Sequence, residues 1–415
     1  MDITKKCKMK ALVLCGGLSQ IAAIKELKSR GIEAYLADMN EKAPAVPYAD
    51  KFFKVSTLDV DGIRKVVIDE KVDFLVSVCA DQMILVVSQI SEELNLPCYI
   101  DYETAQNVSN KEYMKSIFMK HGVPTSKFIV KGELNESDIK GMDFPLITKP
   151  VDAYSSKGVR RVNNWEELKR AFNEAVEISR TNTAIVEEYV GGEEYTVDVY
   201  VEDGVAKVLC IGILDKIPEK GKFVICRGRY PSGVTQDIKQ RITDAAQKIA
   251  EAFGLKNTPM LIQLKVDNDR LSVIEFCART GGGIKFRLIP EISGFDVVKA
   301  VIDLTLGEKP HVKPFVDDAH IINEFIYCKP GKYSQLVGLK ELQEEGVIDD
   351  YFIFKPQGYE FGEIKSSGDR LAYFCVSAKD EESLRDKHTI ASNRIKALND
   401  SGVDLICHEY MKLPN

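Results

Sequence analysis

A lysine at the end of an apolar segment is the first residue placed to do chemistry. Lys149 closes the segment 144–150, which reads Phe-Pro-Leu-Ile-Thr-Lys-Pro. A loop of small and basic residues follows it: Ser155, Ser156, Lys157 and Gly158. An ammonium group offsets phosphate charge, and backbone N–H groups of a flexible loop close over phosphate oxygens. The segment therefore suits a polyphosphate, with a plain surface strand and turn as the equal alternative.

A second group of polar residues follows another apolar segment, which we expect to form a strand at 184–189. The strand ends in a run of functional groups: Glu187, Glu188, Tyr189, Val190 and, beyond a Gly-Gly turn, Glu194. This order fits a nucleotide hinge, with an acid for an exocyclic amine, main-chain groups for the adenine edge and an acid for ribose hydroxyls. A solvated hairpin is the alternative.

Two further segments carry oxygen ligands. Residues 261–267 and 271–283 are expected to form adjacent strands, so that Gln263 and Glu275 face one point. Such ligands suit Mg²⁺, which takes one or two protein groups and completes its shell with phosphate oxygens and water.

In this order and spacing, these elements resemble the ATP-grasp superfamily of carboxylate–amine and carboxylate–thiol ligases, in particular its amino-acid ligases and carbamoyl-phosphate-synthetase-like members. The resemblance covers nearly the whole chain and includes a helix at 110–115, the phrase His-Gly-Val-Pro-Thr at 121–125 and a closing strand at 369–374. It implies an α/β (α+β) ATP-grasp fold. An N-terminal doubly wound parallel-sheet domain would precede a small central lid domain and a mostly antiparallel C-terminal domain.

The resemblance also implies roles for single residues. Lys111 and Lys149 match the lysines that hold the ATP phosphates, and residues 155–158 match the loop that folds over them. Residues 187–190 match the adenine hinge, which uses backbone groups of its last two residues. The implied cofactors are ATP and one or two Mg²⁺ ions, with Mn²⁺ as an alternative ion. The other matches are Glu194 for ribose, Gln263 and Glu275 for the metal, and Arg279 for the acyl phosphate or the γ-phosphate.

Two residues of the predicted metal strands depart from the family pattern. Cys277 stands where the metal strand commonly has Asn, and a neutral thiol is a poor ligand for a hard ion. We interpret Cys277 as a small packed residue, and a degenerate, non-catalytic ATP binder is the alternative. Gln263 stands where the family usually has Glu, although Gln occurs there in carbamoyl-phosphate-synthetase-type members.

The substrate site is expected to be basic. Residues 214–216 and 223–233 resemble the mobile segment that closes over the acyl substrate in amino-acid ligases. Clustered guanidinium groups bind carboxylates bidentately, so we expect an acidic substrate. The N-terminal domain would complete the site through Gly17 and Asp81. The predicted catalytic residues are Lys216, Arg279 and Arg287, and the predicted substrate-binding arginines are Arg227 and Arg229.

The first hundred residues alternate strand and helix, which predicts parallel strands with crossover helices. We expect strands at 11–15, 33–38, 74–78 and 98–100. Gly16-Gly17 and Asp38 invite a dinucleotide-binding interpretation, but the third glycine of G-x-G-x-x-G is absent, so a plain strand–turn–helix start is preferred. Further helices are expected at 111–121, after Asn164 as N-cap, and at 236–253. The predicted domains are residues 1–108, 109–190 (lid), 191–310 (catalytic region) and 311–415.

The composition excludes several classes of protein. The chain has 415 residues, a formal charge of −7, 45% hydrophobic and 29% charged residues, which is ordinary for a globular protein. The absence of basic runs argues against nucleic-acid binding. No apolar stretch approaches the ~18 residues of a membrane-spanning helix. Ten cysteines without a Cys-x-x-Cys motif predict free thiols in a reducing cytoplasm.

These expectations combine into one function. The resemblance implies a ligase that uses ATP to activate a carboxylate as an acyl phosphate and joins it to an amine, with release of ADP and phosphate. The partners would be a small-molecule acid and amine, with no nucleic acid or membrane, and a homodimer stays open because dimers are common in the family. The alternatives are a carboxylase, a carbamoyl-phosphate-type enzyme, a non-catalytic ATP-binding protein and a nicotinamide oxidoreductase.

Overall fold

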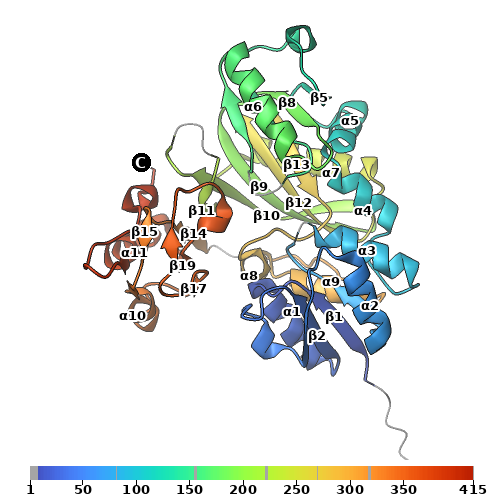
Figure 1. Cartoon of the computed structure of the whole chain (residues 1–415), viewed down its shortest axis with the longest axis vertical. Helices are drawn as coiled ribbons and strands as arrows, with labels where there is room; N and C mark the ends of the chain where they lie inside the picture. The colour runs from blue at the N-terminus through green and yellow to red at the C-terminus, as the bar shows by residue number, and fades with distance from the viewer. Residues whose placement is uncertain are drawn as a thin grey trace, which may run out of the picture.

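The N-terminal sheet is parallel and is covered by helices on both faces (Figure 1). The structure, a computed structural model, describes residues 8–80, 82–153, 157–219, 223–268, 270–315 and 319–414. One face of the sheet packs against α1 (Leu18–Ser29), and the other packs against α2 (Val60–Glu70) and α3 (Met83–Glu93). The doubly wound arrangement is therefore confirmed. The strand order is β3 (Lys51–Lys54), β2 (Glu33–Asp38), β1 (Lys10–Leu14) and β4 (Phe74–Val76).

A helix from much later in the chain completes this N-terminal layer. α9 (Val297–Thr305) packs beside α1, and its Val298 and Ile302 belong to the same buried cluster as Ile24. The N-terminal domain therefore includes residues beyond the expected range 1–108.

The strand expected at 98–100 is wrong. This segment forms no strand and leads into α4 (Tyr102–Ser109), which Asp101 caps by accepting a hydrogen bond from the Thr104 N–H. Pro97 directly before the segment has no N–H to donate to a sheet, which disfavours pairing there.

The lid is a small antiparallel sheet with one helix. Its strand order is β5 (Phe128–Lys131), β8 (Ala184–Glu188), β6 (Leu146–Pro150) and β7 (Arg160–Val162). The apolar face of α6 (Trp165–Ile178) packs against it. Asn164 caps α6 as expected, because its side chain accepts a hydrogen bond from the Glu167 N–H.

An antiparallel sheet of eight strands forms the rest of the framework, and both later parts of the chain contribute to it. α5 (Lys111–His121) and α7 (Gln236–Ala252) cover one face, and α8 (Lys285–Ser293) packs on the other. The sheet therefore joins the regions expected at 191–310 and 311–415. In order, its strands are β13 (Arg270–Cys277), β12 (Thr258–Asp267), β9 (Glu193–Glu202), β10 (Val205–Lys216), β11 (Ile225–Tyr230), β14 (His320–Ile326), β19 (Ala372–Ala378) and β17 (Asp350–Ile353).

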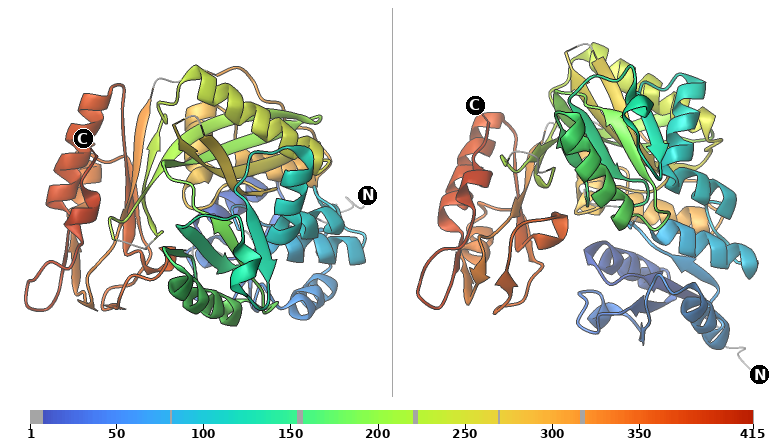
Figure 2. Two further views of the ribbon diagram at one scale, coloured as in Figure 1. Left: turned by 90° about the horizontal axis from the view of Figure 1, so that it is seen from above. Right: turned by 45° about the horizontal axis from the view of Figure 1, so that its top comes forward.

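The C-terminal region lies at the edge of the molecule opposite α2 and α3 (Figure 2). Its helices are α10 (Leu339–Glu344) and α11 (Glu381–Arg394). The short strands β15 (Gly331–Lys332), β16 (Gln335–Val337), β18 (Glu360–Phe361) and β20 (Lys396–Leu398) complete this region.

In the described part of the chain, no helix combines the length and apolar character that crossing a membrane requires.

Candidate functional site

Two cavities adjoin each other, because they share part of their lining. The lid cavity, of about 150 Å³, lies between β6 and β8 of the lid and β12 and β13 of the large sheet. The inner cavity, of about 280 Å³, lies between β13, the start of α8 and β14. The residues that line both cavities are Lys111, Ile225, Gln263 and Glu275. A chemical group transferred from a molecule in one cavity to a molecule in the other would pass beside them.

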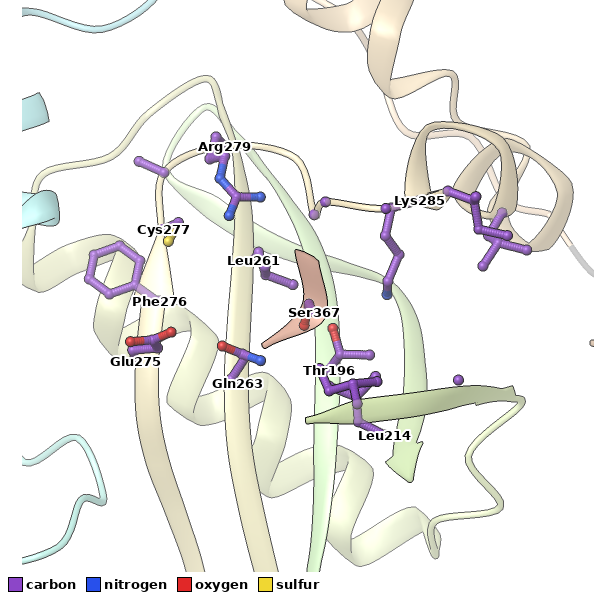
Figure 3. A pocket seen from close by; sticks show the side chains of 18 of the residues that line it. Thr196, Leu214, Leu261, Gln263, Glu275, Phe276, Cys277, Arg279, Lys285 and Ser367 are labelled. Carbon is purple, nitrogen blue, oxygen red and sulfur yellow. The ribbon is translucent and has the colours of Figure 1, made fainter. Parts of the chain in front are cut away.

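The predicted metal ligands lie at this junction. Gln263 on β12 pairs directly with Glu275 on β13, so both side chains lie on the same face of the sheet. Thr196 pairs with Gln263 from the other side, and Figure 3 shows the three side chains in a row on adjacent strands. The Lys111 ammonium lies 3.6 Å from the Glu275 carboxylate and donates a hydrogen bond to the Ala153 carbonyl. A cation and two oxygen ligands thus converge on one point.

Glu187 is the centre of a buried charged cluster in the lid cavity. Its carboxylate lies 2.8 Å from the Lys149 ammonium and 3.2 Å from that of Lys115, and it accepts a hydrogen bond from the Ser126 hydroxyl. Burial alone would raise the pKa of Glu187, but the two lysines outweigh it and lower the pKa to about 2. Burial lowers the pKa of Lys115, and Glu187 opposes that effect.

The predicted adenine hinge, residues 188–190, directly follows Glu187 in the chain. The Tyr189 N–H donates a hydrogen bond to the Pro145 carbonyl, so this N–H is already used inside the lid. The Tyr189 ring stacks with Arg161, whose guanidinium carbon lies 4.2 Å from the ring centroid. Glu188 and Val190 line the lid cavity beside it.

The predicted ribose acid is paired with the predicted catalytic lysine. The Lys216 ammonium donates a 2.8 Å hydrogen bond to the Glu194 carboxylate, and both side chains line the lid cavity. Lys216 does not line the inner cavity. The structure therefore groups Lys216 with the hinge rather than with the substrate region.

Both predicted substrate arginines are held by acids of the protein. Arg227 is 1% exposed and bonds to Glu324 and Asp215 and to backbone carbonyls near the C-terminus. Arg229 forms a bidentate pair with Asp215, at 2.9 and 3.1 Å. Neither residue lines the inner cavity. Asp215 on the paired strand β10 and, for Arg227, the distant Glu324 already occupy these guanidinium groups, so the structure does not present the two arginines to a substrate in the inner cavity.

The two predicted catalytic arginines have different surroundings. Arg287 pairs with Asp350 of β17 and lines neither of the two cavities, so the structure separates it from the site. Arg279 is 7% exposed and lines the inner cavity, where it donates a hydrogen bond to the Thr280 carbonyl. Figure 3 shows Arg279 at the end of β13, beyond Glu275.

The remaining predicted residues lie in loops. Asp81, Ser155 and Ser156 lie outside the described residues. Lys157 lines the lid cavity, and Gly158 has a φ of +74°, which favours glycine. Gly17 caps the start of α1 and lines neither of the two cavities.

Asp38 has a structural role beside that turn. Its carboxylate accepts hydrogen bonds from the N–H groups of Gly16 and Asn40. Of the interpretations weighed from the sequence, this geometry favours a plain strand–turn–helix start over a dinucleotide site.

Comparison with known protein families identifies the domain that carries both cavities. Residues 142–287 match the family model of the ATP-grasp domain. This chain contains an ATP-grasp domain. The match begins before β6, ends in α8 and includes Gln263, Glu275 and Arg279. Lys111 and the C-terminal strands lie outside it.

Solved structures and sequence relatives agree with this assignment. The L-amino acid ligase from Bacillus licheniformis superposes with a TM-score of 0.81 at 19% identity, over 95% of this chain and 99% of the ligase, which establishes the ATP-grasp fold. The L-arginine-specific L-amino acid ligase of Bacillus subtilis is 20% identical over 68% of this chain and 70% of its own length. A carbamoyl phosphate synthase large chain of Clostridium botulinum is 24% identical over 70% of this chain, which spans only 27% of that protein.

Several residues around the inner cavity were not predicted. Lys285 is buried against Asp198, and its ammonium lies 4.8 Å from the Tyr230 ring centroid. Burial would lower the pKa of Lys285, but Asp198 outweighs it and raises the pKa, so the lysine stays charged. Asn323 on β14 and Arg370, in the segment just before β19, also line the cavity. In the sequence, the only indication of a role for Arg370 was its position in the predicted closing strand, residues 369–374.

Cys277 lies on the strand that carries the predicted metal ligand Glu275. It is the last residue of β13, pairs with Leu261 and lines the inner cavity beside Glu275 and Arg279. Its position next to Arg279 is visible in Figure 3. A small side chain at this point leaves room in the cavity.

Proposed function

We propose that the protein is an ATP- and Mg²⁺-dependent ligase that activates a carboxylate as an acyl phosphate and joins it to an amine. The observation that supports this proposal is the junction of the two cavities at Lys111, Gln263 and Glu275. ATP would occupy the lid cavity with its adenine at residues 188–190 and its ribose at Glu194. The acid and the amine would occupy the inner cavity.

The reaction would proceed in two balanced steps. An oxygen of the substrate carboxylate forms a bond to the γ-phosphorus of ATP, and the bond from this phosphorus to the bridging oxygen breaks, which releases ADP. The amine nitrogen then forms a bond to the acyl carbon, the carbon–oxygen bond to phosphate breaks, and the nitrogen loses a proton to solvent. The products are an amide, ADP and phosphate.

The residues at the junction suit charge neutralisation. Lys111 and Lys149 would contact the phosphates, and Arg279 would contact the acyl phosphate in a cavity that limits access of water. The described residues contain no group of three metal-binding side chains, but Gln263 and Glu275 fit Mg²⁺, which needs only one or two protein ligands. When bound, one or two Mg²⁺ ions, or Mn²⁺, would offset phosphate charge during transfer.

The test is ADP release from Mg²⁺-ATP with panels of amino acids, dicarboxylates and bicarbonate, each with and without an amine. We expect release that requires both an acid and an amine, and we expect Glu275→Gln to abolish it while nucleotide binding persists. Glu344→Gln, at a surface pair with Lys340, is the matched control and should leave turnover unchanged. Release with bicarbonate alone as the acid would indicate a carboxylase, and ATP binding without release from any pair would overturn the proposal.

A further inference from the structure

Arg370 presents an open guanidinium group to the inner cavity. Its Nε atom donates a 3.0 Å hydrogen bond to the Tyr327 hydroxyl, and its guanidinium carbon lies 3.6 Å from the centroid of the Phe325 ring. Among the described residues, no hydrogen-bond partner is found for either terminal nitrogen of Arg370. Stacking and one hydrogen bond thus hold the side chain, while its two terminal nitrogens remain available to bind a ligand.

Tyr327 is arranged to keep Arg370 in place. Its hydroxyl donates a 2.9 Å hydrogen bond to the Ile225 carbonyl and accepts one from Arg370. Burial raises the pKa of Tyr327, so the phenol stays neutral and keeps both hydrogen bonds. Tyr327 is 1% exposed, which limits its movement.

Asn323 adds a second polar group to the same wall. It is 4% exposed, it lines the inner cavity, and its Oδ1 atom has no hydrogen-bond partner among the described residues. Asn323 and Phe325 are two residues apart on β14, so both side chains lie on the same face of the strand, which is the face that Arg370 covers. On the neighbouring strand β11, the residue paired with Asn323 is Gly228, which has no side chain to cover the amide. Buried amide groups are normally satisfied, and a donor on a bound molecule would satisfy this one.

The other cations of the inner cavity already face an acid or the reaction junction. Lys285 pairs with Asp198, and Lys111 lies 3.6 Å from Glu275. Arg279 lies just beyond the end of β13, the strand that carries Glu275, and we propose above that it contacts the acyl phosphate (Figure 3). Arg370 is therefore the cation that remains for an anionic group away from the reacting carboxylate.

We propose that Arg370 binds a second carboxylate, one that the reaction does not activate, and that Asn323 hydrogen-bonds to a polar group of the same molecule. This inference rests on the proposed function, because it takes the acid and the amine to occupy the inner cavity. The carboxylate belongs either to a dicarboxylic acid or to an amine that is itself an amino acid. Both share the chemistry that a guanidinium fork recognises, a planar anion bound through two parallel hydrogen bonds.

The test measures binding directly and does not depend on turnover. Titration calorimetry with Mg²⁺-ADP present would compare succinate and glutarate with their monoamides, and glycine and L-alanine with their amides. We expect at least one series to bind more tightly than its amides. Tighter binding of succinate or glutarate would identify a dicarboxylic acid as the source of the carboxylate, and tighter binding of glycine or L-alanine would identify an amino acid. Arg370→Gln should weaken that binding about 10- to 100-fold, as expected for loss of a charge-assisted pair. Arg394→Gln, which removes a surface pair with Glu345, should not change it.

Tyr327→Phe separates positioning from folding. This variant keeps the ring and removes only the hydroxyl that holds Arg370, so binding should weaken less than in Arg370→Gln. Equal binding by carboxylate and amide, equal binding by wild type and Arg370→Gln, or no binding of any probe would overturn the inference. Carboxylate binding through Arg370 without ADP release from any substrate pair would instead overturn the proposed ligase function.

Discussion

The ammonium group of Lys149 lies 2.8 Å from the carboxylate of Glu187 inside the lid cavity. The two residues are diagonal neighbours on paired strands, because Ile147, two residues before Lys149, pairs with Glu187. The same carboxylate binds Lys115. One buried acid therefore positions two lysines at the place where we propose that the nucleotide phosphates bind.

The charge on Glu187 should make stability depend on pH in the acid range. A carboxyl group with a folded pKa of about 2, against an ordinary value of 4.5, stabilises the fold above pH 4.5, and this contribution is lost as pH falls toward 2. The shift corresponds to roughly 3 kcal/mol. Urea unfolding of wild type and Glu187→Gln between these pH values is the measurement. The variant should be less stable at neutral pH and should lack most of this acid-range decline, and parallel curves would contradict the assignment.

The hinge acid should affect nucleotide binding without affecting the acid substrate. Glu194→Gln removes the charge that we propose for the ribose hydroxyls and that Lys216 contacts at 2.8 Å. The ADP affinity should fall about tenfold, because hydrogen bonds to a charged group are lost. Titration of ADP measures this effect. Glu193→Gln changes the adjacent, more exposed acid and serves as control, and an equal effect in both variants would argue against the ribose assignment.

Replacing the thiol at the metal strand should strengthen metal use. Cys277→Asn places an amide oxygen beside Glu275, and hard cations prefer oxygen to a neutral thiol. The Mg²⁺ concentration needed for half-maximal ADP release should fall by about tenfold, as ligand-sphere changes commonly produce. Cys277→Ala removes the thiol without adding an oxygen and should leave this concentration unchanged. A fall in both variants would mean that the thiol itself hinders metal binding.

The turn between hinge and β9 should not tolerate a side chain. Gly192 has a φ of +72°, and a Cβ atom there would lie 2.0 Å from the Val266 carbonyl oxygen. Gly192→Ala should therefore reduce the free energy of unfolding by more than about 2 kcal/mol. Gly204 has a φ of +86° and no atom within 4 Å of a Cβ position, so Gly204→Ala should cost only about 1 kcal/mol. Similar losses in urea unfolding would show that the close contact relaxes freely.

Local signals in the sequence predicted the parts of the site that short segments determine. The helix at 111–121 and the Asn164 cap depend on neighbouring residues only, and both were correct. Gln263 and Glu275 were expected to face one point because each lies in an apolar strand of the same hairpin, and their pairing in the sheet confirms this.

Long-range pairing explains the residues that the sequence could not place. Whether an arginine is available to a substrate depends on whether the fold pairs it with an acid, and distant Glu324 and Asp350 pair with Arg227 and Arg287. Arg370 and Asn323 reach the inner cavity only because β14 and β19 join the large sheet beside β11. Sheet order across such sequence distances has no local signal.

The packing of α9 on the N-terminal sheet has a consequence for how the chain folds during synthesis. The first three parallel strands and α1 emerge from the ribosome early, but the apolar face around Ile24 is covered only when Val298 and Ile302 arrive. The nascent N-terminal layer must therefore remain incompletely covered while the lid and most of the large sheet are translated. A fragment that ends after α4 would carry the same uncovered face, so we expect it to aggregate or to require a separately supplied α9 segment.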